Sequence, residues 1–545
     1  MSGVAPDSRS SSACSHDSFF CRSMALTDPF RKPLTQAQAA HLLRRATLGP
    51  TPAQIRQFTG QTPQTALQTL LATSPTPTPP IDPTTLKPFN TLAFSQPLQG
   101  TWQSATKYWW LGLMLNEGTS LREKMTLFWQ NHFVSTFAVV NDARYMYRQN
   151  ALLRRHALGN FRSFVIDVTK DPAMLRYLNG NQNIVGKPNE NYARELQELF
   201  TIGATNPITG TRNYSEDDVK AAARVLTGWT DTGYRSETTA DMTATFRAAQ
   251  HDTTDKPFSA AYGNTVIKGR SGTTAGDAEL GDLVDMILKQ PETARFIVRK
   301  LYRWFINADI PATIEQGFIE PLAALFRKDY ELKPVLTALL TSEHFFDDAL
   351  RGAMIKAPVE LTIGTLRYFG LAAPDPVANA TGFTALMAYL QARTNEQQQN
   401  VMDQPSVFGW RPYYDVGFYE LWINSTTLAL RSRFANEVSA GAVKYGTDRI
   451  TFDLIAQAKL TSDPADPVKL IDEWTALLFA TQLTQNQRDF LIDSVLMVGV
   501  PRYEWATIWT DYMAAPTNPA RLNAVRTRLT NLLTYMLSMA EYQLN

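Results

Sequence analysis

The chain has 545 residues, of which 44% are hydrophobic and 11% aromatic, so it holds enough apolar side chains for a large buried core. Its 52 basic and 51 acidic residues nearly cancel, and this balance excludes the strongly basic composition typical of nucleic-acid-binding proteins. No run approaches the roughly 18 apolar residues of a membrane-spanning helix, and both cysteines lie in the N-terminal tail, which excludes a disulfide elsewhere.

The N-terminal tail is rich in serine. We expect residues 1–34 to be disordered, and Met24 offers a second start position. The tail has no apolar segment of the length that a secretory signal needs, which makes the cytoplasm the default compartment. Cys14, His16 and Cys21 do not follow the spacing of a closed zinc site, so we expect no metal there.

Signals for helix starts recur from Thr35 onward. Capping boxes are predicted for Thr35 with Gln38, Thr51 with Gln54, Ser120 with Glu123, Ser215 with Asp218, and Thr484 with Gln487. First-turn prolines are predicted at Pro52, Pro63, Pro172, Pro291, Pro467 and Pro519. Apolar residues recur with a helical period over 294–306, 354–369, 419–434 and 520–537. These signals predict an all-α fold, a large bundle-like body of about twenty helices.

Three stretches interrupt the helical pattern. Residues 74–97 are too rich in proline for regular structure and should form an extended connection. Residues 230–276 form an irregular insert, in which the alternating runs at 244–248 and 265–268 are expected to pair as a small β-hairpin. Residues 371–382 have the composition of a linker. We therefore expect one helical part over 35–370 and a second over 383–545.

The segment KPNENYARELQELFTIG at 187–203 is the main candidate for a functional helix, which Gly203 should end as a C-cap. Residues three and four apart share a helix face, so Asn191, Arg194, Glu195 and Glu198 form one polar stripe on an otherwise apolar helix. One interpretation is structural, with Arg194 bridging the two carboxylates. The other is functional, with the two glutamates supplying acid–base groups or metal ligands.

Two histidines, His251 and His132, are further candidates for catalytic residues or metal ligands. His251 and Asp252 lie in the irregular insert, where an imidazole beside a carboxylate suits a general acid–base pair or a metal site. His132 lies in an aromatic helix, where it is either a hydrogen-bonded core residue or a metal ligand. Glu123, on the same helix, has the structural role of a capping partner.

Aromatic faces stack on sugar rings, and two of the 11 tryptophans, Trp229 and Trp410, lie at a helix end and in a loop rather than inside apolar helices. They are therefore the candidate platforms for a carbohydrate substrate. The chain contains no GxSxG, GxxxxGK or GxGxxG motif, so we expect neither a nucleotide nor a flavin.

A series of ordered motifs resembles the bacterial family known as domain of unknown function 1800, over roughly residues 35–545. The motifs are AHLLRRATLG (40–49), LREKMTLFWQNHF (121–133), LLRRHALGNF (152–161), DPAML (171–175), PNENYARELQELFTIG (188–203), YSEDDVKAAARVLTGW (214–229), HD (251–252), RGAMIKAPVEL (351–361), SVFGW (406–410) and LWINSTTLALR (421–431).

The resemblance implies no activity. Genes of similar proteins often lie beside genes for sulfatase-like secreted proteins, so by analogy it implies a sulfatase-like partner and an envelope or secreted role related to polysaccharides. Relatives commonly carry His-x-His where this chain has Gln130, Asn131 and His132. A metal pair at this position would therefore be incomplete here.

Two hypotheses follow. In the first, the protein is an enzyme of hydrolytic or glycan-related chemistry, assisted by a divalent metal. Its catalytic residues would be Arg194, Glu195, Glu198, His251 and Asp252, its substrate-binding residues Asn191, Trp229 and Trp410, and its metal ligands His132, Glu198 and His251. In the second, the protein is a non-catalytic helical scaffold or assembly factor for an envelope or polysaccharide-handling partner, and the polar stripe only fixes the packing of its helix.

Overall fold

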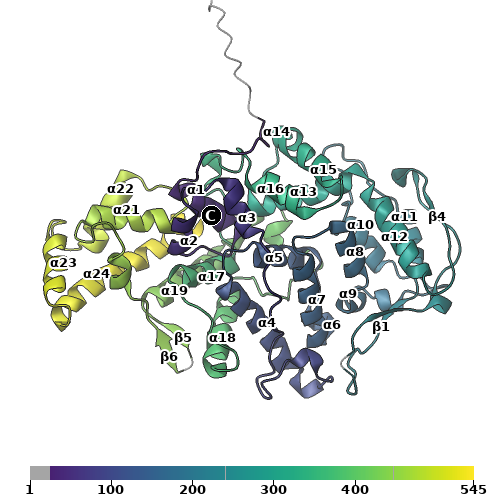
Figure 1. Cartoon of the computed structure of the whole chain (residues 1–545), viewed down its shortest axis with the longest axis horizontal. Coiled ribbons are helices and arrows are strands. Elements are labelled where there is room, and N and C mark those ends of the chain that lie inside the picture. Colours follow the sequence, from purple (N-terminus) through teal and green to yellow (C-terminus); the bar gives the residue numbers. More distant parts are fainter. Residues whose placement is uncertain (1–24, 240, 446) are drawn as a thin grey trace, which may run out of the picture.

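Figure 1 shows the computed structural model of the chain, which describes residues 25–239, 241–445 and 447–545. The tail segment 1–24, with Cys14, His16 and Cys21, lies outside the described residues. The adjoining segment 28–34 also belongs to the predicted disordered tail, but it is bonded to the body. The amide of Phe30 donates to the carbonyl of Thr341, and the amide of Leu34 donates to that of Gln61, both at 2.8 Å.

The described residues form the predicted all-α body, with only small two-stranded sheets beside the helices. The first helices are α1 (Gln36–Ala46), α2 (Pro52–Phe58), α3 (Pro63–Leu70), α4 (Gln99–Asn116), α5 (Arg122–His132), α6 (Phe137–Val140), α7 (Ala143–His156), α8 (Phe161–Thr169), α9 (Pro172–Tyr177), α10 (Asn191–Glu198) and α11 (Glu216–Val225). After the insert come α12 (Ala275–Leu288), α13 (Pro291–Phe305), α14 (Ala312–Ile314), α15 (Glu320–Phe326), α16 (Leu332–Leu340), α17 (Pro358–Tyr368), α18 (Ala380–Glu396) and α19 (Ser425–Ser439). The last helices are α20 (Leu454–Ala458), α21 (Pro467–Leu478), α22 (Gln485–Phe490), α23 (Glu504–Ala514) and α24 (Pro519–Ser538).

Local sequence signals set most of the helix starts. The capping boxes at Thr35, Thr51, Ser215 and Thr484 are present as predicted. The prolines predicted for a first turn all occupy one, at the starts of α2, α3, α9, α13, α21 and α24. These starts were predictable because a cap or a proline acts on the backbone of its own first turn.

The predicted capping box at Ser120 is absent, because the side chain of Glu123 points into the core. Its carboxylate accepts from the Nε of Arg154 at 2.7 Å and from the Nε1 of Trp110 at 2.8 Å. A charge-assisted bond to a buried guanidinium is stronger than a bond to a backbone amide. The interpretation of Glu123 as a capping partner is therefore wrong, although its role is structural.

The irregular insert contains strands, but the two predicted runs do not pair with each other. The first run contributes β2 (Ala244–Phe246), which pairs antiparallel with β1 (Trp229–Asp231). The second contributes β4 (Val266–Ile267), which pairs antiparallel with β3 (Lys256–Pro257). Each run thus pairs with a segment nearer in the sequence, which closes a shorter loop than the predicted pairing. A third pair, β5 (Val443–Tyr445) with β6 (Asp448–Ile450), was not predicted.

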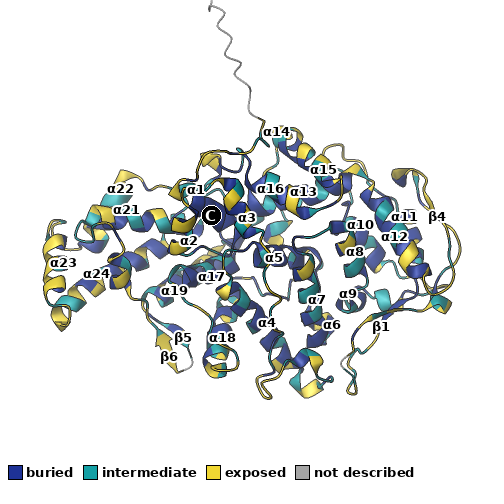
Figure 2. Ribbon diagram, in the orientation of Figure 1, coloured by how far each residue is buried: buried dark blue, intermediate teal, exposed yellow. Residues whose placement is uncertain are grey.

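Buried hydrophobic residues connect the two predicted helical parts. A single cluster contains Leu42 of α1, Leu283 of α12 and Leu532 of α24, and Figure 2 shows buried residues on helices throughout the body. The chain end returns to the centre, where Asn545 accepts a hydrogen bond from Arg45 of α1 at 3.1 Å. Because one core contains residues of both parts, the boundary between two helical parts at 371–382 stays a prediction. No helix among the described residues is both long and apolar enough to cross a membrane.

Candidate active site around Lys300

Arg194, Glu195 and Glu198 of the α10 stripe are half-buried, and the hydrogen bonds of the arginine go to other carboxylates than the two that it was expected to bridge. Arg194 donates to Glu190 at 3.2 Å and to Glu216 at 2.8 Å, so the interpretation in which it bridges Glu195 and Glu198 is wrong. Asn191 is exposed at the start of the helix.

Without that bridge, Glu195 and Glu198 form a half-buried carboxyl pair on α10. Burial, followed by the nearby charge of Glu198, raises the pKa of Glu195 to about 7. Glu198 accepts a hydrogen bond from the hydroxyl of Tyr214 at 3.1 Å.

Helix α10 ends earlier than predicted. It stops at Glu198, and turns connect it to Gly203. The amide of Gly203 donates to the carbonyl of Gln197 at 2.9 Å, and its φ of +81° suits glycine.

His251 and Asp252 belong to a buried ionic cluster that holds the insert to α12. The Nε2 of His251 lies 3.1 Å from the carboxylate of Glu279, and the Nζ of Lys256 lies 2.6 Å from the same carboxylate. Asp252 accepts from the Nε of Arg224 at 2.7 Å. Burial raises the pKa of Asp252, but hydrogen bonds from Arg224 and Thr254 outweigh burial and hold the pKa far below its usual range.

The structure does not bring His251 and Glu198 together. The Nδ1 of His251 lies 2.9 Å from the carbonyl of Thr227, just beyond the C-terminal end of α11. Glu198 is bonded to Tyr214, just before the N-terminal end of that helix. The 10 residues of α11 span about 15 Å, so the two side chains are bonded to residues at opposite ends of this helix.

The geometry therefore does not assemble the proposed metal ligands. His132, Glu198 and His251 do not converge, and within the described ranges no three His, Cys, Asp or Glu side chains converge on a point that would suit a metal ion.

The two predicted tryptophan platforms are also apart and largely covered. Trp229 is 6% exposed and packs against Phe246, with ring centroids 5.3 Å apart. Trp410 is 1% exposed, and its backbone amide donates to the Oδ1 of Asn131 at 2.8 Å. Neither ring offers an open face to solvent, but Trp410 fixes one end of a loop that borders a pocket.

That pocket contains a lysine bonded to a histidine. The Nε2 of His132 lies 3.0 Å from the carbonyl oxygen of Phe200, which can only accept, so Nε2 carries the ring proton. The Nδ1 of His132 is then an acceptor, and it lies 3.0 Å from the Nζ of Lys300. Lys300 also donates to the carbonyl of Leu199 at 3.3 Å. The carbonyls that end the α10 segment thus position both side chains.

The electrostatics of this pair favour uncharged groups. Burial and the neighbouring guanidinium of Arg303 lower the pKa of Lys300 to about 7. Burial and the charge of Lys300 hold the pKa of His132 well below its usual value. An uncharged amine has two N–H groups, which His132 and Leu199 occupy, and a lone pair that stays free to accept a proton. Lys300 is thus placed to act as a base near neutral pH.

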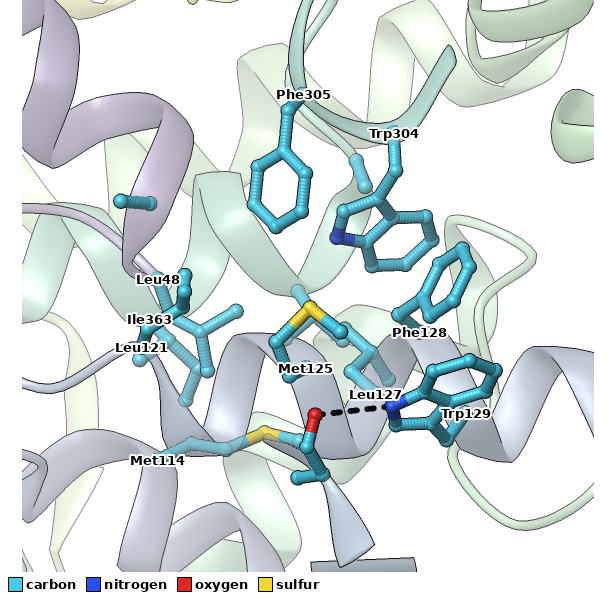
Figure 3. Packing of buried hydrophobic residues seen from close by; sticks show 14 of the residues in the cluster. Leu48, Met114, Leu121, Met125, Leu127, Phe128, Trp129, Trp304, Phe305 and Ile363 are labelled. Atoms are coloured by element: carbon cyan, nitrogen blue, oxygen red, sulfur yellow. Dashed lines mark hydrogen bonds between the residues drawn. The ribbon is translucent and has the colours of Figure 1, made fainter. Parts of the chain in front are cut away.

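Aromatic side chains surround the pair. Phe128 of α5 and Trp304 of α13 form the inner wall, with ring centroids 5.4 Å apart, and Figure 3 shows them packed beside Met125 and Trp129. The outer wall is a loop, residues 410–422, which contributes Tyr413, Phe418 and Tyr419. The enclosed volume is about 30 Å³, room for a water molecule or a carboxylate-sized group, and the pocket opens to the surface.

The outer loop is held in an unusual conformation. Phe418 has a φ of +42°, in the left-handed region that bulky residues rarely adopt. The guanidinium of Arg303 lies 4.9 Å from the centre of the Phe418 ring, which brings a second positive charge to the mouth of the pocket. Such backbone strain is concentrated at functional sites.

The sequence identified His132 but not Lys300 or Arg303. In the sequence, both cations belong to the amphipathic run 294–306, where alternation of charge and apolar residues indicates only a helix. The contact between His132 and Lys300 joins residues 168 positions apart, which no local pattern reveals. The sequence shows only that no Asp or Glu lies three or four positions from Lys300, which leaves the lysine without an acidic partner on its own helix.

The comparisons with known proteins place the chain in a family without assigning it an activity. No curated protein and no solved structure matches the chain significantly. The family model described as "Protein of unknown function (DUF1800)" matches residues 41–544, nearly the whole length, as the motifs predicted, and the chain belongs to this family.

Proposed function

We propose that the protein is an enzyme of hydrolytic or glycan-related chemistry, with its reaction centred on Lys300. The observation that supports this most is the amine of Lys300, with a pKa of about 7, bonded to His132 at the base of an open pocket. A base works best when its pKa lies near the working pH. Lys300 has this property, and the described pocket lining contributes no carboxylate that would keep its proton in place.

In this proposal Lys300 accepts a proton from a substrate group or from a bound water. In a hydrolysis the water oxygen then bonds to the reacting carbon and the bond to the leaving group breaks. The proton of the Lys300 ammonium passes to the leaving group, and repulsion from the neighbouring Arg303 favours this transfer. His132 is a positioning residue, since its Nδ1 orients the amine and its own proton is bonded to Phe200. A preorganised base of this kind contributes about 10²- to 10⁴-fold to a rate.

The charge and shape of the pocket support an acidic sugar as the substrate. Arg303 provides a permanent positive charge at the mouth of the pocket, where its guanidinium can pair with a carboxylate while the amine of Lys300 stays free to act as the base. A sugar ring attached to that carboxylate would lie across Phe418 and Tyr419 at the mouth. Aromatic faces of this kind suit the apolar faces of sugars.

A matched pair of ligands tests the proposal. Glucuronate and glucose differ in the carboxylate, so isothermal titration calorimetry should detect glucuronate binding and at least about tenfold weaker binding of glucose. Arg303→Gln should weaken glucuronate binding at least about tenfold, because it removes the charge that pairs with the carboxylate. Lys289→Met removes an exposed lysine just before α13, the helix that carries Lys300 and Arg303, and should leave glucuronate binding unchanged. Equal binding of both sugars, or unchanged glucuronate binding in Arg303→Gln, would contradict the proposal.

A further inference from the structure

A second, larger pocket lies at α4, away from the charged residues of the Lys300 site. Helices α4 and α18 lie side by side (Figure 1), and the two irregular segments 78–83 and 373–376 complete the wall. The enclosed volume is about 450 Å³, within the range of pockets that bind small molecules.

Small residues on one face of α4 create this space. Gly100, Ser104 and Gly112 repeat at intervals of four or eight residues and therefore share a face of the helix. A Cβ at Gly100 would meet no atom within 4 Å, so the space beside it is open. A Cβ at Gly112 would lie 3.0 Å from the ring of Phe383 of α18, so glycine here lets that ring approach.

Side chains of α4 hold both irregular walls in place. The Nε1 of Trp109 donates to the carbonyl of Thr78 at 2.7 Å. The amide of Ala373 donates to the Oδ1 of Asn116 at 2.7 Å. Proline fixes the backbone angle φ, and both walls contain prolines that line the pocket, Pro79 and Pro374 among them. The pocket is therefore preformed, which lowers the entropic cost of binding a ligand.

The lining identifies the chemistry of the ligand. None of the described residues that line the pocket is charged. The rings of Tyr108, Trp109 and Phe383 and the side chains of Ile81 and Leu113 provide apolar surface. The uncharged polar side chains of the lining are Thr78, Thr101, Ser104, Asn116 and Thr384. A charged ligand would lose its hydration here without gaining an ionic partner.

From this geometry we infer that the α4–α18 pocket binds an uncharged, largely apolar small molecule with a ring-sized body. This site is independent of the Lys300 site, where the charge of Arg303 favours an anionic ligand instead. The inference does not rest on the proposed function. Failure of the glucuronate test leaves the α4–α18 pocket unaffected, and failure of the probe test leaves the Lys300 site unaffected.

Two fluorescent probes that share one aromatic skeleton test the inference. N-phenyl-1-naphthylamine is uncharged, and 1-anilinonaphthalene-8-sulfonate carries a negative charge. We expect the uncharged probe to bind one site per chain, with a dissociation constant at least about tenfold lower than that of the sulfonate. Comparable binding of the two probes, or no binding of the uncharged one, would overturn the inference.

Substitutions at Ser104 locate the binding. Ser104→Trp fills the space with a large side chain, and Ser104→Asp places a charge in it, so each should weaken binding of the uncharged probe at least about tenfold. Gln103→Trp, one position along α4 and outside the lining, is the matched control and should bind as the natural chain does. Circular dichroism confirms that each variant is folded. Unchanged binding in a folded Ser104 variant would show that the probe binds elsewhere and would overturn the inference.

Discussion

At the scale of single residues, position relative to other charges decides what each ionisable group can do. Lys300 and Lys256 illustrate this. Lys256 lies 2.6 Å from the carboxylate of Glu279 and is fully buried, so its charge is compensated and its role is structural. Lys300 is bonded to a neutral ring and a carbonyl, and burial together with the neighbouring charge of Arg303 lowers the pKa of its amine to about 7.

Glu195 should reveal its raised pKa through stability. Its pKa is about 7 in the folded protein and 4.5 in the unfolded chain. The stabilisation that comes from the protonated carboxyl is thus complete below about pH 4.5 and is lost as the pH rises through 7. Glu195→Gln should therefore be more stable than the natural chain at pH 8, but not at pH 4. Because Glu195 is only half-buried, we discount the effect for solvent screening to about 1 kcal/mol.

Urea unfolding at pH 4 and pH 8 measures this difference. Glu190→Gln is the control. It removes a carboxylate at the start of α10, and this carboxylate pairs with Arg194 at 3.2 Å. It should give no gain in stability at pH 8. A Glu195→Gln variant that is less stable than the natural chain at pH 8 would mean that the ionised carboxylate has a favourable partner.

Residue roles were only partly predictable from the sequence. Helical spacing placed Asn191, Arg194, Glu195 and Glu198 on one helix, and the structure has them there. It could not show that Arg194 pairs with Glu190 and Glu216 instead, because the partner on α11 comes from a different element. Catalytic, substrate-binding and metal roles for the sequence candidates stay predictions.

At the scale of elements, local signals predicted helix starts better than they predicted pairing. Caps and first-turn prolines act within about four residues, so α1, α2, α11 and α24 begin as predicted. Strand pairing in the insert depends on which segments meet after folding. The sequence contains no register signal for it, since the strands are only two or three residues long.

The insert should depend on its buried ionic cluster. Glu279→Ala would leave Lys256 and His251 without their carboxylate in a fully enclosed position. Removing one partner of a buried ion pair costs about 3–5 kcal/mol. We expect a correspondingly lower midpoint in chemical unfolding and faster proteolysis within residues 230–276.

An exposed ion pair in the same insert serves as the matched control. Lys268 and Asp255 lie 2.7 Å apart, with side chains 72% and 51% exposed. Lys268→Ala should cost less than about 1 kcal/mol, because solvent screens exposed pairs. Equal losses of stability in Glu279→Ala and Lys268→Ala would show that burial does not make the first interaction more important than the second.

At the scale of the whole molecule, distant segments are tied together by buried arginines. Arg45 donates to the carbonyls of Ile306, Leu350 and Asn545 at 3.0, 2.8 and 3.1 Å. These bonds join α1 to the end of α13 and to the end of the chain. The all-α class and the family were predictable, because composition, helical period and ordered motifs extend over the whole chain. The two pockets were not, since each combines side chains from elements far apart in the sequence.

The amine of Lys300 should lose its proton near neutral pH, and a titration of that amine tests the proposed site most directly. Lysines dimethylated with ¹³C-formaldehyde give methyl resonances whose shifts follow the charge of the amine. We expect one resonance to titrate near pH 7 and to be missing from Lys300→Arg. If the resonance assigned to Lys300 by that variant titrates at about 10, as for a solvent-exposed lysine, the account of this site is wrong.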